Sequence, residues 1–191
     1  MKGIFIEKYG PPRVLREKEL EDPRPAPEEV LIEVDYSGIN FADLLQRLGR
    51  YGNTPSLPYI PGFEVSGRVL ETGSKVSTLR KGDGVVAMSR FGGYAEKVCA
   101  AESQCRKIPP QLDPREAAAI PVNFLTAYFC LFNMGNLQEG ETVLVQGGAG
   151  GVGTAAVQLA LLKGARVFAT AGFPEKIDFL NELGVEKAIN H

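Results

Sequence analysis

Apolar and polar residues alternate along several short stretches of the first 110 residues. The clearest stretch is 30–36, where Val30, Ile32, Val34 and Tyr36 fall on one side and Glu33 and Asp35 on the other. This alternation predicts a strand with one buried face. Further strands are expected at 1–7, 14–20, 63–70, 85–87 and 94–100, with turns between them such as Gly82-Asp83-Gly84. Many short strands separated by turns predict a compact β-barrel-like domain up to about Pro110.

Helical signals are few in this part of the chain and frequent after it. Asn40 is placed as the N-cap of a short helix, 41–48. Asp113-Pro114 marks a helix start with proline at the first helical position. The long apolar run 120–132 predicts a helix that links two domains. A strand at 143–145, a helix after the glycines, a strand at 166–169, a helix at 174–183 capped by Gly184, and a strand near Ala188 follow.

The glycine-rich turn lies between the strand at 143–145 and the helix after it. Its glycines are spaced as G-x-x-G-x-x-G at Gly147, Gly150 and Gly153, with Gly148 and Gly151 between them. Strand, glycine turn and helix form the first part of a nucleotide-binding βαβ unit. A turn without side chains lets the backbone approach a pyrophosphate, and the N–H groups of the helix start bind it. The alternative interpretation is an ordinary tight turn.

The second domain is expected to be incomplete. A doubly wound nucleotide-binding domain needs two βαβαβ halves, and this sequence holds one half with its third strand barely begun. We therefore expect a substrate domain over 1–118 and the first half of a Rossmann domain over 119–191. We also expect the chain to be a fragment of a longer protein.

Composition and charge argue against several classes of protein and of site. Of the 191 residues 44% are hydrophobic and 23% are charged, the net charge is −2, and no basic block stands out, so nothing points to nucleic acid or an integral membrane segment. Three cysteines without framework spacing indicate free thiols in a reducing compartment, expected to be the cytoplasm. With His191 as the only histidine, the chain lacks the material for a zinc centre or a catalytic triad.

Several segments resemble one family, the zinc-free medium-chain dehydrogenase/reductases of the quinone oxidoreductase type. They are Asn40-Phe-Ala-Asp43, Phe63-Glu-Val-Ser-Gly67 with Gly82-Asp83, and 141–158, although Leu161 departs from the family pattern. Within the family, 121–128 and 136–138 look closest to the branch of the synaptic vesicle amine transport protein. The resemblance implies a GroES-like substrate domain followed by a Rossmann domain, and a homodimer for the full-length protein.

The resemblance also bears on metal chemistry. Asn40, Phe63 and Val122 stand where zinc-dependent relatives hold the catalytic metal, and no metal site is expected here. Without a Lewis acid, hydrogen bonds must polarise the carbonyl, which favours quinones or enones as acceptors.

Two residues are predicted to be catalytic. Asn40 could donate an amide N–H to a substrate oxygen or face the nicotinamide, and its alternative role is the helix N-cap. Tyr51 lies in a glycine-flanked loop and could stack on the nicotinamide or bond an oxygen; its alternative is a surface aromatic. Asp43 is expected to be structural, bonding Arg47 or the backbone, and Gln46 and Arg90 are minor candidates.

The cofactor is expected to be NADPH. No acid follows the second strand of the unit, where an NAD site would place one, and Lys176 could pair a 2′-phosphate. Lys176 could equally be a solvated helix residue. The resemblance places Thr126 near the nicotinamide. The alternative is that Thr126 is an ordinary core residue of its helix. The predicted cofactor-binding set is Asn40, Thr126, Gly147, Gly150, Gly151, Val152, Gly153 and Lys176.

The expected function is NADPH-dependent hydride transfer to a quinone or enone. The alternative is an NADPH-binding protein with a structural or regulatory role in partner or vesicle-membrane association. Because the nicotinamide normally also contacts the missing half, this piece alone is expected to bind NADPH weakly and to catalyse poorly.

Overall fold

The computed structural model describes residues 1–52 and 54–190. They form two compact units, Met1–Pro121 and the residues from Val122 onward. The first unit is mostly β and the second combines a parallel sheet with helices, so the predicted α/β fold class is confirmed. No helix among the described residues has the length and apolar character needed to cross a bilayer.

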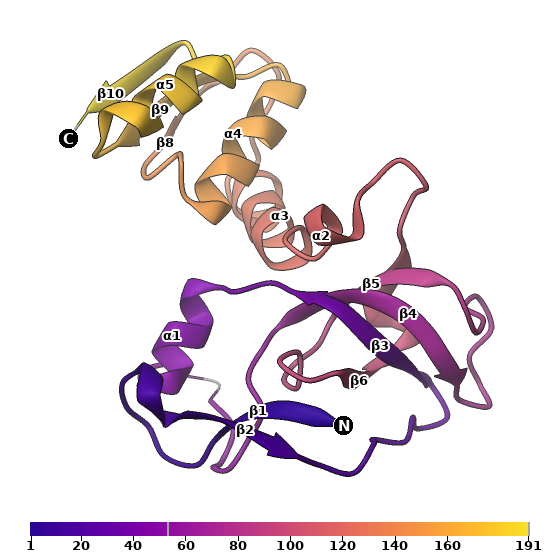
Figure 1. Ribbon diagram of the computed structural model, residues 1–191. Coiled ribbons are helices and arrows are strands. Elements are labelled where there is room, and N and C mark those ends of the chain that lie inside the picture. The colour runs from indigo at the N-terminus through magenta and orange to yellow at the C-terminus, as the bar shows by residue number, and fades with distance from the viewer. Residues whose placement is uncertain (53, 191) are drawn as a thin grey trace. The chain divides into compact units, whose positions relative to one another are not determined.

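The first unit is built on a five-stranded antiparallel sheet in the order β6-β3-β4-β5-β7. Its central pair is β3 and β4, which Figure 1 shows as long curved strands side by side. Alternating side chains of β3, β4 and β5 enter one core, which contains Val30, Ile32, Val65, Val69 and Val85. The strands are β3 (Glu29–Ser37), β4 (Glu64–Thr72), β5 (Gly84–Met88), β6 (Lys97–Ala101) and β7 (Cys105–Lys107).

Smaller elements complete the unit. A two-stranded antiparallel sheet pairs β1 with β2, and α1 follows β3 directly. Asp113 caps α2 as predicted, because its carboxylate accepts the Arg115 N–H at 2.7 Å. The elements are β1 (Lys2–Ile6), η1 (Pro12–Val14), β2 (Leu15–Glu19), α1 (Phe41–Arg47), η2 (Glu102–Gln104) and α2 (Pro114–Ala117).

The alternation in β3 differs from the prediction at one residue. Val30 and Ile32 are fully buried, but Tyr36 is 46% exposed. The pairing of β3 with β4 shifts register between Val34 and Tyr36, as at a β-bulge. The extra residue turns the following side chains to the other face, so the prediction that Tyr36 shares the buried face is wrong.

One carboxylate ties the loop before β5 to η2. Oε1 of Glu102 accepts the N–H groups of Ser77 at 2.9 Å and Thr78 at 2.6 Å, and the Thr78 hydroxyl at 2.7 Å. These bonds, led by the Thr78 N–H, lower the pKa of Glu102 to about 2. The ionised carboxylate accepts these bonds more strongly than the neutral acid does, so they favour the charged form.

We expect the hydrogen bonds accepted by Glu102 to stabilise the fold at neutral pH and to lose this effect in acid. A carboxyl whose pKa is lowered by folding stabilises the fold above its unfolded pKa, and the contribution disappears as pH falls towards about 2. Thermal unfolding should therefore show Glu102→Gln less stable than wild type at pH 7, with a smaller difference at pH 3. Exposed Glu19→Gln is the control. A difference that does not change with pH would contradict this account.

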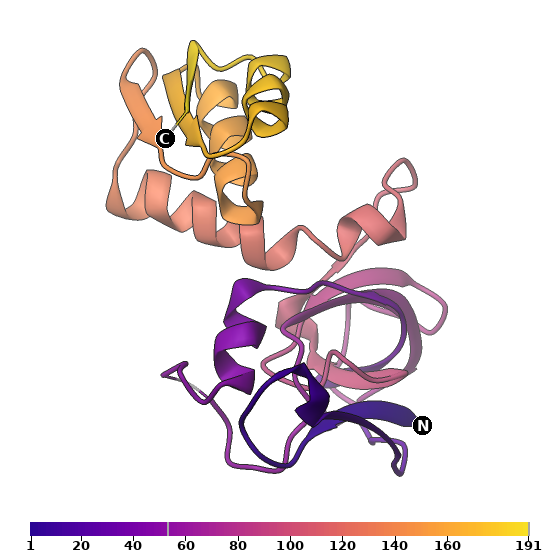
Figure 2. The ribbon, with the colours of Figure 1, turned by 60° about the vertical axis from the view of Figure 1, so that its left-hand side comes forward.

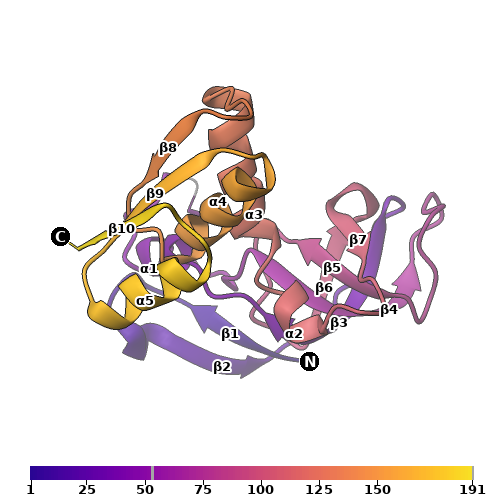
Figure 3. The same ribbon diagram turned by 90° about the horizontal axis from the view of Figure 1, so that it is seen from above.

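The second unit is a three-stranded parallel sheet in the order β10-β9-β8, with helices in the crossovers. Figure 3 shows the strands side by side, with α4 and α5 beside them. The core holds Val145, Val157, Val167 and Leu180. The elements are β8 (Thr142–Val145), α4 (Gly151–Leu162), β9 (Arg166–Ala171), α5 (Pro174–Glu182) and β10 (Lys187–Asn190).

The predicted helix 120–132 is not a uniform α-helix. It consists of α3 (Pro121–Tyr128) and a π-helical segment, η3 (Phe129–Met134), which run as one rod in Figure 2. The Gly135 N–H bonds the Cys130 carbonyl at 2.9 Å, five residues back. An apolar run predicts a helix, but it does not show whether each N–H bonds the carbonyl four residues back, as in an α-helix, or five residues back, as in a π-helix.

The strand predicted at 94–100 begins later, at Lys97. Tyr94 instead donates its N–H to the Pro61 carbonyl at 2.9 Å, outside the β6–β3 ladder.

Candidate functional site

The glycine-rich turn between β8 and α4 has the geometry that the sequence predicts. Gly147 has φ +64°, a conformation that favours glycine. Its carbonyl accepts the Gly150 N–H at 2.9 Å, which closes the turn. Gly150 is then the N-cap of α4, with extended backbone. The spacing of the glycines therefore produces a tight turn that leads directly into a helix.

Two glycines are required by close backbone packing. A Cβ on Gly153 would lie 2.2 Å from the Gly147 carbonyl oxygen and 2.8 Å from the Gly148 Cα. A Cβ on Gly148 would lie 2.8 Å from the Ala169 Cβ and 3.1 Å from the Leu180 Cδ2. The first turn of α4 thus packs against the glycine turn, and that turn packs against β9 and α5.

The start of α4 can bind a diphosphate. The first intrahelical bond of α4 runs from the Thr154 N–H to the Gly150 carbonyl at 2.7 Å, and the N–H groups of Gly151, Val152 and Gly153 precede it. Helix geometry gives such first-turn N–H groups no intrahelical partner, and they attract anions. Gly147, Gly150, Gly151 and Val152 are exposed. The backbone here is not covered by side chains of the turn, which fits a bound dinucleotide.

Sequence reasoning missed two residues at this turn. The Thr170 hydroxyl accepts the Gly147 N–H at 3.1 Å, and the Thr170 carbonyl accepts the Gly148 N–H at 2.9 Å. The Asn123 amide lies beside Gly151, where an added Cβ would meet its Oδ1 at 2.6 Å. A polar residue near the carboxyl end of β9 was the available signal for Thr170, since that edge meets the turn.

The other predicted cofactor residues of this unit are exposed. The Thr126 hydroxyl donates to the Val122 carbonyl at 2.6 Å, within its own helix. The Lys176 Nζ lies 5.4 Å from the centroid of the Phe173 ring, in the first turn of α5. No acidic residue occurs from Ala169 to Phe173.

In the first unit, Asn40 is buried and bonded to a buried carboxylate. Its Nδ2 donates to Oε1 of Glu64 at 2.7 Å, and both residues are less than a tenth exposed. A Cβ on Gly38 would lie 2.2 Å from that Glu64 oxygen, so the carboxylate needs a glycine there. Sequence reasoning missed Glu64, although it belongs to the quoted motif Phe63-Glu-Val-Ser-Gly67.

Asn40 is also the N-cap of α1, as predicted. Its N–H donates to Oδ2 of Asp43 at 2.8 Å, so the predicted structural role of Asp43 through the backbone is confirmed. Burial raises the pKa of Asp43. It also raises the pKa of Tyr94, and that of Tyr59 to about 12, with Asp43 adding to both shifts. Gln46 is fully buried in α1.

Tyr51 lies at a pocket of about 370 Å³. Its ring meets the Phe63 ring edge-on, with centroids 6.0 Å apart. Phe63 directly precedes Glu64, so the two predicted catalytic residues, Tyr51 and Asn40, contact consecutive residues of the chain. The pocket is lined by Tyr51, Phe63, Met88, Ser89, Arg90, Phe91 and Gln104.

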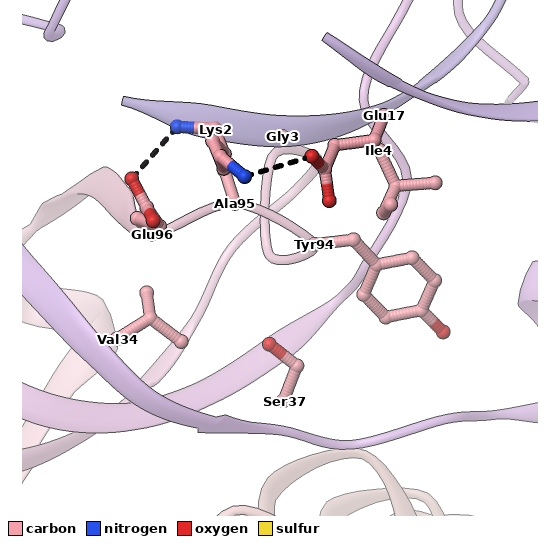
Figure 4. A pocket seen from close by; sticks show the side chains of 9 residues that line it. All are labelled: Lys2, Gly3, Ile4, Glu17, Val34, Ser37, Tyr94, Ala95 and Glu96. Atoms are coloured by element: carbon pink, nitrogen blue, oxygen red, sulfur yellow. Dashed lines mark hydrogen bonds and ion pairs between the residues drawn. The ribbon is translucent and has the colours of Figure 1, made fainter. Parts of the chain in front are cut away.

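A second pocket, of about 330 Å³, lies beside β1 and is shown in Figure 4. Its charged groups pair with one another: Lys2 Nζ lies 3.0 Å from Glu17 Oε1, and the Lys2 N–H donates to Glu96 at 2.7 Å. The Ser37 hydroxyl donates to the Gly93 carbonyl at 2.5 Å. Its lysine, its two carboxylates and its serine hydroxyl already have partners within the protein, so it is a weaker candidate than the pocket at Tyr51.

Within residues 1–52 and 54–190, no three His, Cys, Asp or Glu side chains gather in a metal-ligating group.

Comparison with known proteins finds a matching family model in each of the two units. Residues 26–110 match the family model for the alcohol dehydrogenase GroES-like domain, and residues 151–191 match the model for zinc-binding dehydrogenase. Quinone oxidoreductase-like protein 2 of Bos taurus is 42% identical over 171 residues, which cover 88% of this chain and 49% of that protein.

Two solved structures match nearly the whole chain. The quinone oxidoreductase of Thermus thermophilus, also solved in complex with NADPH, is 41% identical with a TM-score of 0.88, covering 98% of this chain and 59% of that one. The human synaptic vesicle membrane protein VAT-1 homolog-like protein is 38% identical with a TM-score of 0.93, covering 98% and 60%. The chain thus spans about half to three fifths of the length of these relatives. From its two domain matches and these relatives, the chain belongs to the quinone oxidoreductase type of the medium-chain dehydrogenase/reductase family.

Proposed function

We propose that the protein is an NADPH-dependent oxidoreductase that transfers hydride to a quinone or an enone without zinc. The observation that carries the proposal is the turn at 147–153, where exposed residues at Gly147, Gly150 and Gly151 lead into first-turn N–H groups. In this assignment residues 1–118 are the substrate domain, and the cofactor domain begins at residue 119.

NADPH is favoured over NADH by the residues after β9. An NAD site would place an acid there to bind the ribose hydroxyls, and this strip has none. Lys176, in the first turn of α5, supplies a cation for a 2′-phosphate. A related quinone oxidoreductase from Thermus thermophilus and a mycobacterial protein, both solved with NADPH, support the same choice.

The residues at the metal positions implied by the family support zinc independence. Phe63 and Val122 have no ligating atom, and Asn40, which caps α1 and donates to Glu64, is not one of the usual Cys, His or carboxylate ligands of zinc. Carbonyl polarisation then depends on hydrogen bonds. Since one amide N–H of Asn40 is held by Glu64, donation to a substrate oxygen rests on its second N–H.

The bound nicotinamide supplies the hydride. The N–H groups of Gly151, Val152 and Gly153 would hold the diphosphate of a bound NADPH, and the family resemblance implies that Thr126 would lie near its nicotinamide. Tyr51 and Phe63 provide aromatic surface for a planar acceptor, and rate arises mainly from this positioning.

Replacing Tyr51 in the full-length protein tests the assignment in an NADPH-oxidation assay with a simple quinone. Tyr51→Ala should lower kcat/KM by about fivefold, because an aromatic contact worth roughly 1 kcal/mol is removed. Tyr51→Phe, which keeps the ring, should remain within about twofold of wild type. Undiminished turnover in Tyr51→Ala would remove this residue from the site.

A second function is favoured by the likeness to the human VAT-1 homolog-like protein. In this second candidate function, NADPH is a structural or regulatory ligand of the present protein, which acts in partner or vesicle-membrane association. Tight NADPH binding without turnover of any quinone or enone would support this alternative over the reductase.

The proposal extends to assembly and location. We expect a homodimer for a protein of the relatives' length, as the family resemblance implies. The free thiols Cys99, Cys105 and Cys130 fit a reducing compartment, so we expect the cytoplasm.

A further inference from the structure

The pocket at Tyr51 contains a single charged side chain. Four of its seven lining residues are aromatic or thioether side chains, and Ser89 and Gln104 are neutral. Arg90 is the exception, and no carboxylate is among the lining residues. The pocket therefore combines apolar surface for a planar ring with one positive charge.

Arg90 has no acidic partner among the residues that the structure describes. Its guanidinium carbon lies 5.7 Å from the centroid of the Phe91 ring, and the side chain forms none of the ion pairs found there. Lys2, in the pocket of Figure 4, contrasts with it because Glu17 pairs that lysine. A guanidinium resting on an aromatic face keeps its donors for a carboxylate or sulfonate.

Resting on the proposed function, we propose that Arg90 makes this pocket selective for planar acceptors that carry an anionic substituent. The ring of the acceptor lies against Tyr51, Phe63 and the neighbouring apolar side chains. Its carboxylate or sulfonate pairs with Arg90. The physiological acceptor is then a negatively charged quinone or enone rather than a neutral one.

Equilibrium binding of two redox-inert probes tests this selectivity. Naphthalene-2-carboxylate and naphthalene-2-carboxamide have nearly the same shape and differ in charge. Calorimetry on the 191-residue chain should show the carboxylate binding about fivefold more tightly at low salt, the upper range for a partly exposed ion pair. The preference should shrink as salt is added, because screening weakens exposed pairs.

Variants assign the preference to Arg90. Arg90→Met should abolish it while leaving the carboxamide affinity and the thermal unfolding unchanged, and Arg90→Lys should retain part of it. Arg68→Met, an exposed site on β4 outside the pocket, removes the same charge and should keep the full preference.

Three results would overturn the inference: equal affinity for the two probes, a preference that survives in Arg90→Met, or binding of neither probe to the chain. The measurement needs no NADPH and no turnover. A failure to oxidise NADPH with any acceptor would instead refute the proposed function, so the two failures are distinguishable.

Discussion

Gly153→Ala is expected to weaken NADPH binding by about 100-fold or more and to destabilise the second unit by about 3 kcal/mol, the upper range for overpacking at a tightly packed site. The added Cβ would lie 2.2 Å from the Gly147 carbonyl oxygen and 2.8 Å from the Gly148 Cα. Both neighbours are backbone atoms, so no flexible side chain can move aside. The helix start must shift away from the glycine turn.

This shift would displace the groups proposed to bind the diphosphate. The N–H groups of Gly151, Val152 and Gly153 belong to the turn of α4 that moves. Hydrogen bonds to a charged group contribute about 1.5–3 kcal/mol each, so losing two of them weakens binding by about 100-fold or more. Titration calorimetry with NADPH measures this loss.

Thr154→Ala is the matched control, since Thr154 follows Gly153 and its hydroxyl makes only a long contact of 3.4 Å with the Gly148 carbonyl. It should keep nearly native stability and NADPH affinity. Native affinity in Gly153→Ala would show that the packing of this helix start is irrelevant to the cofactor.

Gly67→Ala is expected to unfold or severely weaken the first unit, with a loss of about 3 kcal/mol or more. Gly67 pairs with Val34 in the central β3–β4 ladder. A Cβ there would lie 1.9 Å from the Glu33 carbonyl oxygen and 3.0 Å from the Ile32 Cγ2. The two strands at the centre of the sheet would have to separate.

Urea unfolding followed by tyrosine fluorescence measures this effect, because five of the six tyrosines precede Val122. Gly84→Ala is the control on neighbouring β5, where an added Cβ meets nothing within 4 Å. It should be neutral or slightly stabilising, because alanine restricts the unfolded chain. Equal stability of the two variants would contradict the packing argument.

The turn and its flanking elements could be predicted because their signals are local. A short apolar run, closely spaced glycines and a second apolar run identify β8, the turn and α4 without reference to distant residues. Gly147 has the positive φ expected of such a turn. Gly153 belongs to the predicted glycine spacing, and its close backbone contact is with the glycine turn.

Other features depend on contacts that the sequence does not reveal. Tyr36 was assigned to the wrong face because the β-bulge arises from pairing with a separate strand. Glu64 bonds Asn40 across 24 residues, and Thr170 bonds Gly147 across 23. The sequence shows that these polar residues are present. Which of them bond one another becomes evident only once the strands are placed beside one another.

The central claim is that a dinucleotide diphosphate binds the main chain between Gly147 and Gly153. Amide NMR spectra of the ¹⁵N-labelled 191-residue chain, recorded during titration with NADPH, test it most directly. The account predicts that the largest shift changes occur at the N–H groups of Gly151, Val152 and Gly153. Saturable shifts confined to residues outside the turn, or no shifts at any NADPH concentration, would contradict it.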